Sequence, residues 1–287
     1  MSRSCCGGRE ELNGFALSAE GNDAEIIRRG VEFVGRNPSG CAVLLDFDGT
    51  LAHVVDHPDD AAALPESVEA IVRLIPLVGR VALVSGRPVA DLRSRIEVDG
   101  LLYSGLYGLE HAIGAGEIGV DPKAAAWIPE VAMVTEAAIE WAASADAELD
   151  GIVIEGKGLS VTLHYRMTAD HALAHEVVAD WARGEAARTG MRVIFGKLNV
   201  ELVPPIDSDK GSAADELIAG MDSCLYIGDD CGDLPAFDAI RRWGRDSLVL
   251  AVQSSELPAD VGEKADAIIG GPQGVARLLG QVAESLD

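Results

Sequence analysis

The sequence predicts an α/β protein whose parallel sheet is interrupted by an inserted α+β unit. Short apolar runs alternate with helical segments before residue 112 and again after residue 204, which is the pattern of βαβ units. Between these stretches, closely spaced strand pairs are joined through Gly-containing turns, as in antiparallel hairpins. The 287 residues are 48% hydrophobic but only 5% aromatic, which suits aliphatic strands covered by Ala-rich helices. This length favours two cores over one.

The amino-terminal segment, residues 1–38, is predicted to hold a tail and one short helix. Residues 1–21 are rich in Gly, Ser and charge and show no periodicity, which is typical of a mobile tail. Apolar positions within 22–36 predict an amphipathic helix capped by Asn22 or Asp23. Asn37-Pro38-Ser39-Gly40 then ends it.

The first part of the predicted sheet lies in residues 39–112. Its predicted strands and helices are Cys41–Leu45, a helix near 65–78, Val81–Val84, a helix near 88–97, and Leu101–Tyr103. Parallel βαβ units have right-handed crossovers, and their ligands bind beyond the carboxyl ends of the strands. Polar residues at those ends are therefore the candidates for function.

The inserted unit is predicted over residues 113–203. Its elements are a helix near 122–149, strands at Gly151–Glu155 and Leu159–Tyr165, a helix near 169–189, and strands at Met191–Phe195 and Asn199–Val203. Pro204-Pro205 closes the insertion, and the βαβ pattern resumes in 204–287. There the predicted elements are a helix after Asp209, Cys224–Ile227, a helix near 234–243, Leu248–Val252, Ala267–Ile269, and a helix from about Pro272.

The charge of the chain excludes several classes of partner. A formal net charge of −24 repels nucleic acids and anionic membrane surfaces, so we expect neither as a partner. A phosphate-bearing substrate must then be met by a metal and a few placed cations. The five cysteines are scattered, and no apolar run approaches the ~20 residues that span a bilayer, so we expect a cytoplasmic protein without a disulfide framework.

Two carboxylates, Asp46 and Asp48, follow the first predicted strand directly in the segment Asp46-Phe47-Asp48-Gly49-Thr50. An Asp-Gly turn is the ordinary reading. Like charges this close at a sheet edge are costly unless they share a cation or a proton, which favours metal-phosphate chemistry. A calcium loop fits less well, because no helix precedes the segment and the required Gly and distal Glu are missing from His53 to His57.

Three further groups follow later strands or begin helices. Ser85-Gly86-Arg87 ends the strand Val81–Val84, where a hydroxyl and backbone N–H groups can hold phosphate oxygens; a helix-capping loop is the alternative. Lys210 precedes a helical run, where a solvated surface lysine is the alternative. The segment from Gly228 to Asp233 follows Cys224–Ile227 and adds carboxylates suited to Mg²⁺.

Together these groups predict a mechanism. Mg²⁺ is held by Asp46, Asp229 and the backbone carbonyl of Asp48. Asp46 attacks phosphorus and forms an aspartyl phosphate, while Asp48 acts first as acid and then as base. The phosphate oxygens are bound by Ser85, Gly86, Arg87 and Lys210. Asp230 and Asp233 are expected to orient metal waters or Lys210.

These motifs resemble those of the haloacid-dehalogenase-like hydrolases, and more narrowly of the trehalose-6-phosphate phosphatase family. The resemblance covers residues 40–275. It is carried by the four core motifs and by Pro58-Asp59-Asp60-Ala61, Gly105–Glu110, Glu155-Gly156-Lys157, His164-Tyr165-Arg166, and Gly196-Lys197 with Glu201 and Pro204. It implies a Rossmann-like core with an inserted cap, and a cap that reads the sugar through Glu155, Lys157, Arg166, Lys197 and Glu201. A solvated hairpin face is the alternative for these five.

One segment departs from the family pattern: Gly232-Asp233-Leu234 stands where the family has a Thr-Asp-Glu triplet, so a hydroxyl and a carboxylate are missing. The resemblance implies a Mg²⁺-dependent hydrolysis of trehalose 6-phosphate to trehalose and phosphate, with the cap closing over the disaccharide. Leu234 keeps two alternatives open. The first is a phosphatase of sucrose phosphate, a glycosyl phosphoglycerate or another sugar phosphate. The second is a non-catalytic protein that binds the sugar phosphate and has a regulatory role. A trehalose-6-phosphate synthase is a candidate partner, and the oligomeric state stays undetermined.

Overall fold

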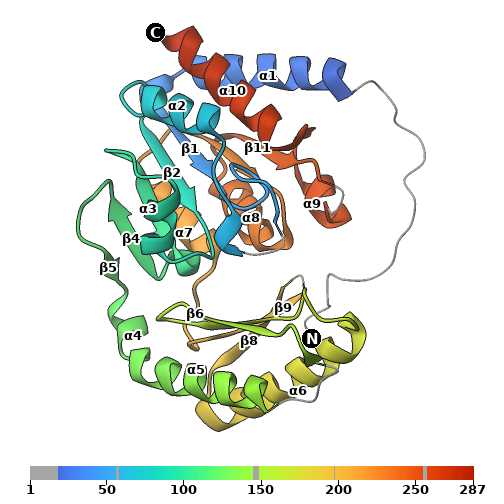
Figure 1. Cartoon of the computed structure of the whole chain (residues 1–287). Coiled ribbons are helices and arrows are strands. Elements are labelled where there is room, and N and C mark those ends of the chain that lie inside the picture. Colours follow the sequence, from blue (N-terminus) through green and yellow to red (C-terminus); the bar gives the residue numbers. More distant parts are fainter. Residues whose placement is uncertain (1–18, 56–57, 145–148, 197, 255–256) are drawn as a thin grey trace. The chain divides into compact units, whose positions relative to one another are not determined.

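The computed structural model describes residues 19–55, 58–144, 149–196, 198–254 and 257–287 (Figure 1). The chain divides into two compact units, each described by itself below. The first takes the described residues up to Glu117 and those from Ser208 to Asp287, and the second is Ile118–Asp207. Within the described part of the chain, no helix has both the length and the apolarity needed to cross a membrane.

The first unit is built on a sheet in the order β12-β11-β10-β1-β2-β3-β4. Its strands are β1 (Cys41–Leu45), β2 (Arg80–Val84), β3 (Leu102–Gly105), β4 (Glu110–Ile113), β10 (Ser223–Gly228), β11 (Asp246–Val252) and β12 (Ala267–Ile269). Neighbouring strands pair in parallel from β12 to β3, and β4 pairs antiparallel with β3. All residues of β1 and β10 are buried, as expected for parallel strands covered on both faces. The predicted fold class is confirmed.

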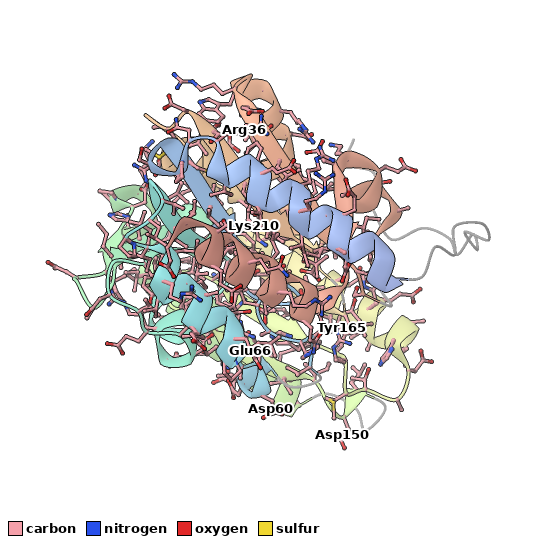
Figure 2. The ribbon with its side chains drawn as sticks, turned by 90° about the horizontal axis from the view of Figure 1, so that it is seen from above. Arg36, Asp60, Glu66, Asp150, Tyr165 and Lys210 are labelled. Atoms are coloured by element: carbon pink, nitrogen blue, oxygen red, sulfur yellow. The ribbon has the colours of Figure 1, made fainter. Side chains whose placement is uncertain are left out.

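Helices cover both faces of this sheet. They are α1 (Ala19–Gly35), α2 (Pro65–Leu74), α3 (Val89–Arg95), α7 (Lys210–Leu217), α8 (Leu234–Trp243), α9 (Ala259–Lys264) and α10 (Gly271–Leu286). On one face, Phe237 and Ile240 of α8 pack with Ala214 of α7 against alternate strand residues such as Leu44 and Tyr226. α1, α2 and α10 form the other layer, and α1 and α10 lie side by side in both views (Figures 1 and 2).

The amino-terminal helix is present, but its predicted cap is wrong. α1 begins at Ala19, so Asp23 lies inside the helix. There its carboxylate accepts hydrogen bonds from the Gly270 amide (2.9 Å) and from Arg277 Nη2 (2.5 Å), and the side chain is 10% exposed. The burial of Asp23 against the start of α10 therefore anchors α1 to the first unit.

β4 was not predicted, because the chain reverses direction before it in a turn that the sequence pattern does not indicate. Leu106 and Tyr107, in the turn between β3 and β4, both have positive φ (47° and 60°). Such angles are unfavourable for residues with a Cβ, so surrounding contacts must hold them. Ser208 Oγ donates to the Tyr107 carbonyl and the Tyr107 amide donates to the Ser85 carbonyl, which fixes the turn beside the loop after β2.

The second unit contains an antiparallel sheet in the order β6-β7-β9-β8. Its elements are β5 (Gly119–Val120), α4 (Pro122–Ala125), α5 (Ile128–Ala143), β6 (Val153–Gly156), β7 (Val161–His164), α6 (His171–Thr189), β8 (Arg192–Gly196) and β9 (Asn199–Val203). α5 and α6 pack on the sheet through a core that includes Val134, Leu163, Val178 and Val200.

The single helix predicted near 122–149 is wrong in its continuity. Two helices occupy its described part, because Asp121 caps α4 through the amides of Lys123 and Ala124, and Pro129 stands in the first turn of α5. Proline is favoured there and starts a new helix. Residues 145–148 lie outside the described residues.

Candidate active site

Three of the predicted residues follow neighbouring parallel strands. Asp46 follows β1, Ser85 follows β2 and Asp229 follows β10, and β1 lies between the other two strands. The Asp46 amide donates to the carbonyl of Ile227 (2.9 Å), which continues the β1–β10 ladder into the loops. The carboxyl edge of the sheet thus brings these motifs together, as it does for ligand sites in open α/β sheets.

Lys210 joins two of the acids. Lys210, labelled in Figure 2, is the first residue of α7. The helix begins there because the Asp209 side chain accepts from the amides of Gly211 and Ser212. The Lys210 Nζ lies 2.8 Å from Asp46 Oδ1 and 2.8 Å from Asp233 Oδ1, and the side chain is 5% exposed. Burial opposes the charge of Lys210, but these carboxylates raise its pKa well above the ordinary value, so the ammonium stays charged.

Asp233 is a shared acceptor with no exposed surface. Its carboxylate accepts from Lys210 Nζ, from the Tyr226 hydroxyl (2.7 Å), and from the amides of Asp229 (3.0 Å) and Asp230 (3.1 Å). One side chain therefore fixes both the lysine and the loop that carries the acids after β10.

The acids gathered here fit a divalent cation. Asp46, Asp229 and Asp233 each offer a carboxylate oxygen, and the three oxygens lie within 4.8 Å of one another. Burial, followed by the charge of Asp46, raises the pKa of Asp229 to about 10, and burial raises that of Asp46 well above its ordinary value. Lys210 alone does not balance this charge, whereas a hard, oxygen-seeking cation would.

Gly49 shows how closely the loop after β1 approaches Asp229. The residue has φ +75°, and a Cβ built there would lie 2.0 Å from Asp229 Oδ2. Only glycine fits this combination of backbone angle and space. The loop that carries Asp46 and Asp48 is therefore held against the Asp229 carboxylate.

Arg87 contacts the candidate acid and base. Its Nε and Nη2 donate to the two oxygens of Asp48 at 2.6 and 2.7 Å, and Nη1 donates to Asp91 Oδ2 at 2.7 Å. The Arg87 side chain is 10% exposed and that of Asp48 is 44% exposed. The structure thus places Arg87 on Asp48, and its contact with phosphate stays a prediction.

Ser85 and Gly86 form the turn after β2. The Ser85 hydroxyl accepts from the Arg87 amide (3.2 Å) and so keeps its own hydrogen for donation to a phosphate oxygen. A Cβ at Gly86 would meet the Tyr107 ring and hydroxyl at 2.8 Å, so any larger residue would have to displace that tyrosine. The predicted phosphate-binding turn is therefore backed by an aromatic side chain.

In the second unit, three of the predicted sugar-reading residues gather on one face of the antiparallel sheet. Lys157 Nζ lies 3.3 Å from Glu201 Oε1 and 3.8 Å from Glu155 Oε2. Ser160 Oγ donates to Glu201 (2.6 Å), and His164 Nε2 lies 2.8 Å from Glu155. Thr162, between them in register, pairs with both Glu155 and Glu201. We call Glu155, Lys157 and Glu201 the cap cluster.

The other two predicted cap residues are Arg166 and Lys197. Arg166 follows β7, and its backbone carbonyl accepts from His171 Nε2 (2.9 Å); among the described residues it does not join the cap cluster. Lys197 lies outside the described residues. Their roles stay predictions.

Sequence reasoning did not single out Tyr226, Asp91 or Arg95. A tyrosine inside an apolar strand is a signal, because its buried hydroxyl needs a partner, and here that partner is Asp233. Asp91 and Arg95 stand four residues apart in a helical segment and resemble an ordinary surface pair. Only their contacts with Arg87 and its surroundings distinguish them.

Sequence comparison identifies relatives of this chain. A sequence-family model described as trehalose-phosphatase matches residues 44–266. The chain is 39% identical over 219 residues to an uncharacterized glycosyl hydrolase of Mycobacterium tuberculosis, an alignment that covers 73% of this chain and 16% of that protein. It is 35% identical over 226 residues to the trehalose-phosphate phosphatase of Mycobacterium leprae, which covers 75% of this chain and 51% of that protein. The chain thus spans about half of the phosphatase and a small part of the larger protein.

Solved structures show the same fold. The C-terminal domain of the Candida albicans trehalose-6-phosphate phosphatase matches with a TM-score of 0.72 at 21% identity, over 93% of this chain and 98% of that domain. A haloacid dehalogenase-like hydrolase from B. subtilis matches with a TM-score of 0.54 at 15% identity, over 83% of this chain and 98% of that one.

Proposed function

The chain belongs to the trehalose-phosphatase family of haloacid-dehalogenase-like hydrolases, and on that premise we propose that it hydrolyses trehalose 6-phosphate to trehalose and phosphate. The observation that carries the proposal is the buried arrangement of Asp46, Lys210 and Asp229 at the carboxyl edge of the sheet. It supplies a nucleophile, a cation and a metal-binding carboxylate in one place.

In the first step, an oxygen of Asp46 attacks phosphorus while the bond from phosphorus to the sugar oxygen breaks. An aspartyl phosphate forms at Asp46, and the departing oxygen takes its proton from the carboxyl group of Asp48. Lys210, 2.8 Å from Asp46, holds the nucleophile and neutralises charge on the phosphate oxygens. The Ser85 hydroxyl and the Gly86 amide donate to the same oxygens.

In the second step, water attacks phosphorus and the bond to Asp46 breaks. Asp48, now a carboxylate, accepts the proton of the attacking water and so returns to its starting form. Inorganic phosphate leaves, and Asp46 is regenerated. Asp233 keeps Lys210 and the loop after β10 in place through both steps.

We propose Mg²⁺ as the cation, because all the candidate ligands are oxygens, which hard divalent cations prefer. Asp46 and Asp229 would hold it together with the backbone carbonyl of Asp48, while Asp230 would act from further out. Bound there, Mg²⁺ would supply the positive charge that offsets the carboxylates and the phosphate. The fit rests on the closeness of the Asp46 and Asp229 carboxylate oxygens and on the raised pKa of Asp229.

The cap cluster is proposed to contact the sugar. Carboxylates and an ammonium group that already share hydrogen bonds match the hydroxyl groups of a disaccharide. Because Leu234 stands in place of the family's Glu, a different sugar phosphate is the second candidate substrate.

Steady-state phosphate release tests the proposal. The full chain with Mg²⁺ should turn over trehalose 6-phosphate faster than sucrose phosphate, a glucosyl phosphoglycerate or glucose 6-phosphate, and Asp46→Asn should release no phosphate above background. Asp238→Asn is a matched control, because Asp238 pairs with Lys264 at an exposed position. Turnover by Asp46→Asn would overturn the mechanism, and preference for another sugar phosphate would overturn the substrate.

A further inference from the structure

We propose that Asp91 and Arg95 of α3 are positioning residues that hold Arg87, and through Arg87 place the Asp48 carboxyl group for proton transfer to the leaving sugar oxygen. This inference rests on the proposed function of Asp48 as the acid and base. Neither Asp91 nor Arg95 touches the reacting atoms in this account.

The contact of Arg87 with Asp48 is bidentate. Both Asp48 oxygens accept from one guanidinium, at 2.6 and 2.7 Å, which fixes the plane of the carboxyl group as well as its distance. The Asp48 side chain is 44% exposed, so packing surrounds only part of it. The orientation of Asp48 therefore depends on where Arg87 is held.

Asp91 binds the guanidinium nitrogen of Arg87 that does not contact Asp48. It accepts from Arg87 Nη1 (2.7 Å), a group that takes no part in the contact with Asp48. The guanidinium can therefore keep its place when Asp48 takes up a proton, and Asp48 then retains one of its two hydrogen bonds to Arg87. Although burial acts to raise the pKa of Asp91, hydrogen bonds from Arg95 and Arg87 lower it below the ordinary value, so Asp91 stays a carboxylate.

Arg95 fixes Asp91 in turn. Its Nε and Nη2 donate to both Asp91 oxygens at 2.8–3.1 Å, and its Nη1 donates to the carbonyls of Asp59 (3.0 Å) and Ala61 (2.5 Å). The Arg95 side chain is only 9% exposed. Residues 59–61 belong to the segment that returns to the nucleophile loop, where Ala63 pairs with Ala52. The chain of contacts thus starts and ends on the segment that carries Asp46 and Asp48.

Glu110 fixes the start of α3. Its carboxylate accepts from the Val89 amide (2.8 Å), the first residue of the helix. The Leu106 amide donates to the Arg87 carbonyl (3.0 Å), so the backbone two residues before the helix is held as well. These contacts set the register of α3, and with it the positions of Asp91 and Arg95.

A pair of substrates that differ in their need for a proton tests the inference. A sugar alkoxide leaves with a proton from Asp48, whereas p-nitrophenolate leaves without one. In single turnovers with enzyme in excess, Asp91→Asn, which keeps the size of the side chain, should slow release of the sugar by roughly tenfold or more, out of the 10²–10⁴ that general acid catalysis supplies. It should slow release of p-nitrophenolate by less than about twofold, because the water-activating step of Asp48 follows leaving-group release on either substrate.

The ratio of the two rates is independent of the folded fraction, so a purely structural effect would lower both rates together. Arg95→Gln, which removes the support of Asp91 from the other side, should show the same selective loss and serves if Asp91→Asn is insoluble. Asp238→Asn should change neither rate. Parallel losses on both substrates, or no loss on the sugar phosphate, would overturn the inference.

The outcome is distinguishable from a failure of the proposed substrate. If the wild-type chain prefers another sugar phosphate, the same comparison is made with that compound, because it too has an alkoxide leaving group. If the wild-type chain turns over p-nitrophenyl phosphate but no sugar phosphate, then Asp48 transfers no proton to a sugar and the inference fails together with the proposed function.

Discussion

Replacing Asp233 by Asn should destabilise the first unit more than any other change that keeps the shape of a buried side chain at the site. The carboxylate accepts from Lys210, Tyr226 and two backbone amides, and it has no exposed surface. An Asn amide has one oxygen and one NH₂ group. If the oxygen stays with the backbone amides, the NH₂ group faces the Lys210 ammonium, and two donors are opposed.

The magnitude follows from these contacts. Loss of the hydrogen bond to the charged lysine costs about 1.5–3 kcal/mol, and a buried donor left unsatisfied costs about 1–3 kcal/mol more, which together suggest ~4 kcal/mol. Tyr226→Phe is the matched comparison, because it removes one neutral donor to the same oxygen. It leaves Lys210 in place, so it should cost only about 1 kcal/mol.

Hydrogen exchange followed by mass spectrometry is suited to this test, because peptides report the first unit by itself. Peptides that cover β10 and α7 should lose roughly 1000-fold in protection for Asp233→Asn and roughly fivefold for Tyr226→Phe, in buffer without divalent metal. Equal losses for the two variants, or protection within tenfold of wild type for Asp233→Asn, would refute the reasoning.

Three further predictions concern the loop after β1, the metal and the second unit. Gly49→Ala should lower kcat by roughly 100-fold, since a Cβ at φ +75° would displace the Asp229 carboxylate; urea unfolding should also show a loss of about 1–2 kcal/mol. A chelator should abolish turnover and Mg²⁺ should restore it. Without metal the folded state binds a proton at Asp229 up to about pH 10, whereas the unfolded chain releases it near its ordinary value. Thermal unfolding should therefore show stability falling as pH rises between those values, and Mg²⁺ should reduce the fall. Glu201→Gln should raise KM for the sugar phosphate by about tenfold but leave p-nitrophenyl phosphate unaffected, because Glu201 belongs to the cap cluster; equal effects on both substrates would contradict a sugar contact.

The strand-end motifs were predictable because their signals are local. An apolar run followed at once by Asp46, Ser85 or Asp229 marks a strand and its carboxyl end within a few residues of sequence. The parallel α/β class follows from the repetition of that pattern, and the structure confirms it. The break between α4 and α5 also has local signals, the cap at Asp121 and the proline at 129. The apolar periodicity on both sides of the break nevertheless favoured one continuous helical stretch.

The sequence by itself determined which candidate groups are present: a proposed nucleophile, carboxylates that could hold a cation, a lysine and a proposed phosphate-binding turn, each at the end of a strand or the start of a helix. Only the tertiary structure decided which charged groups pair. Asp233 meets Tyr226 and Lys210, and Arg87 meets both Asp48 and Asp91, because β1, β2 and β10 lie side by side and α7 begins next to them. Buried charges are stable only with partners, and those partners come from segments far apart in the chain. No local pattern specifies them.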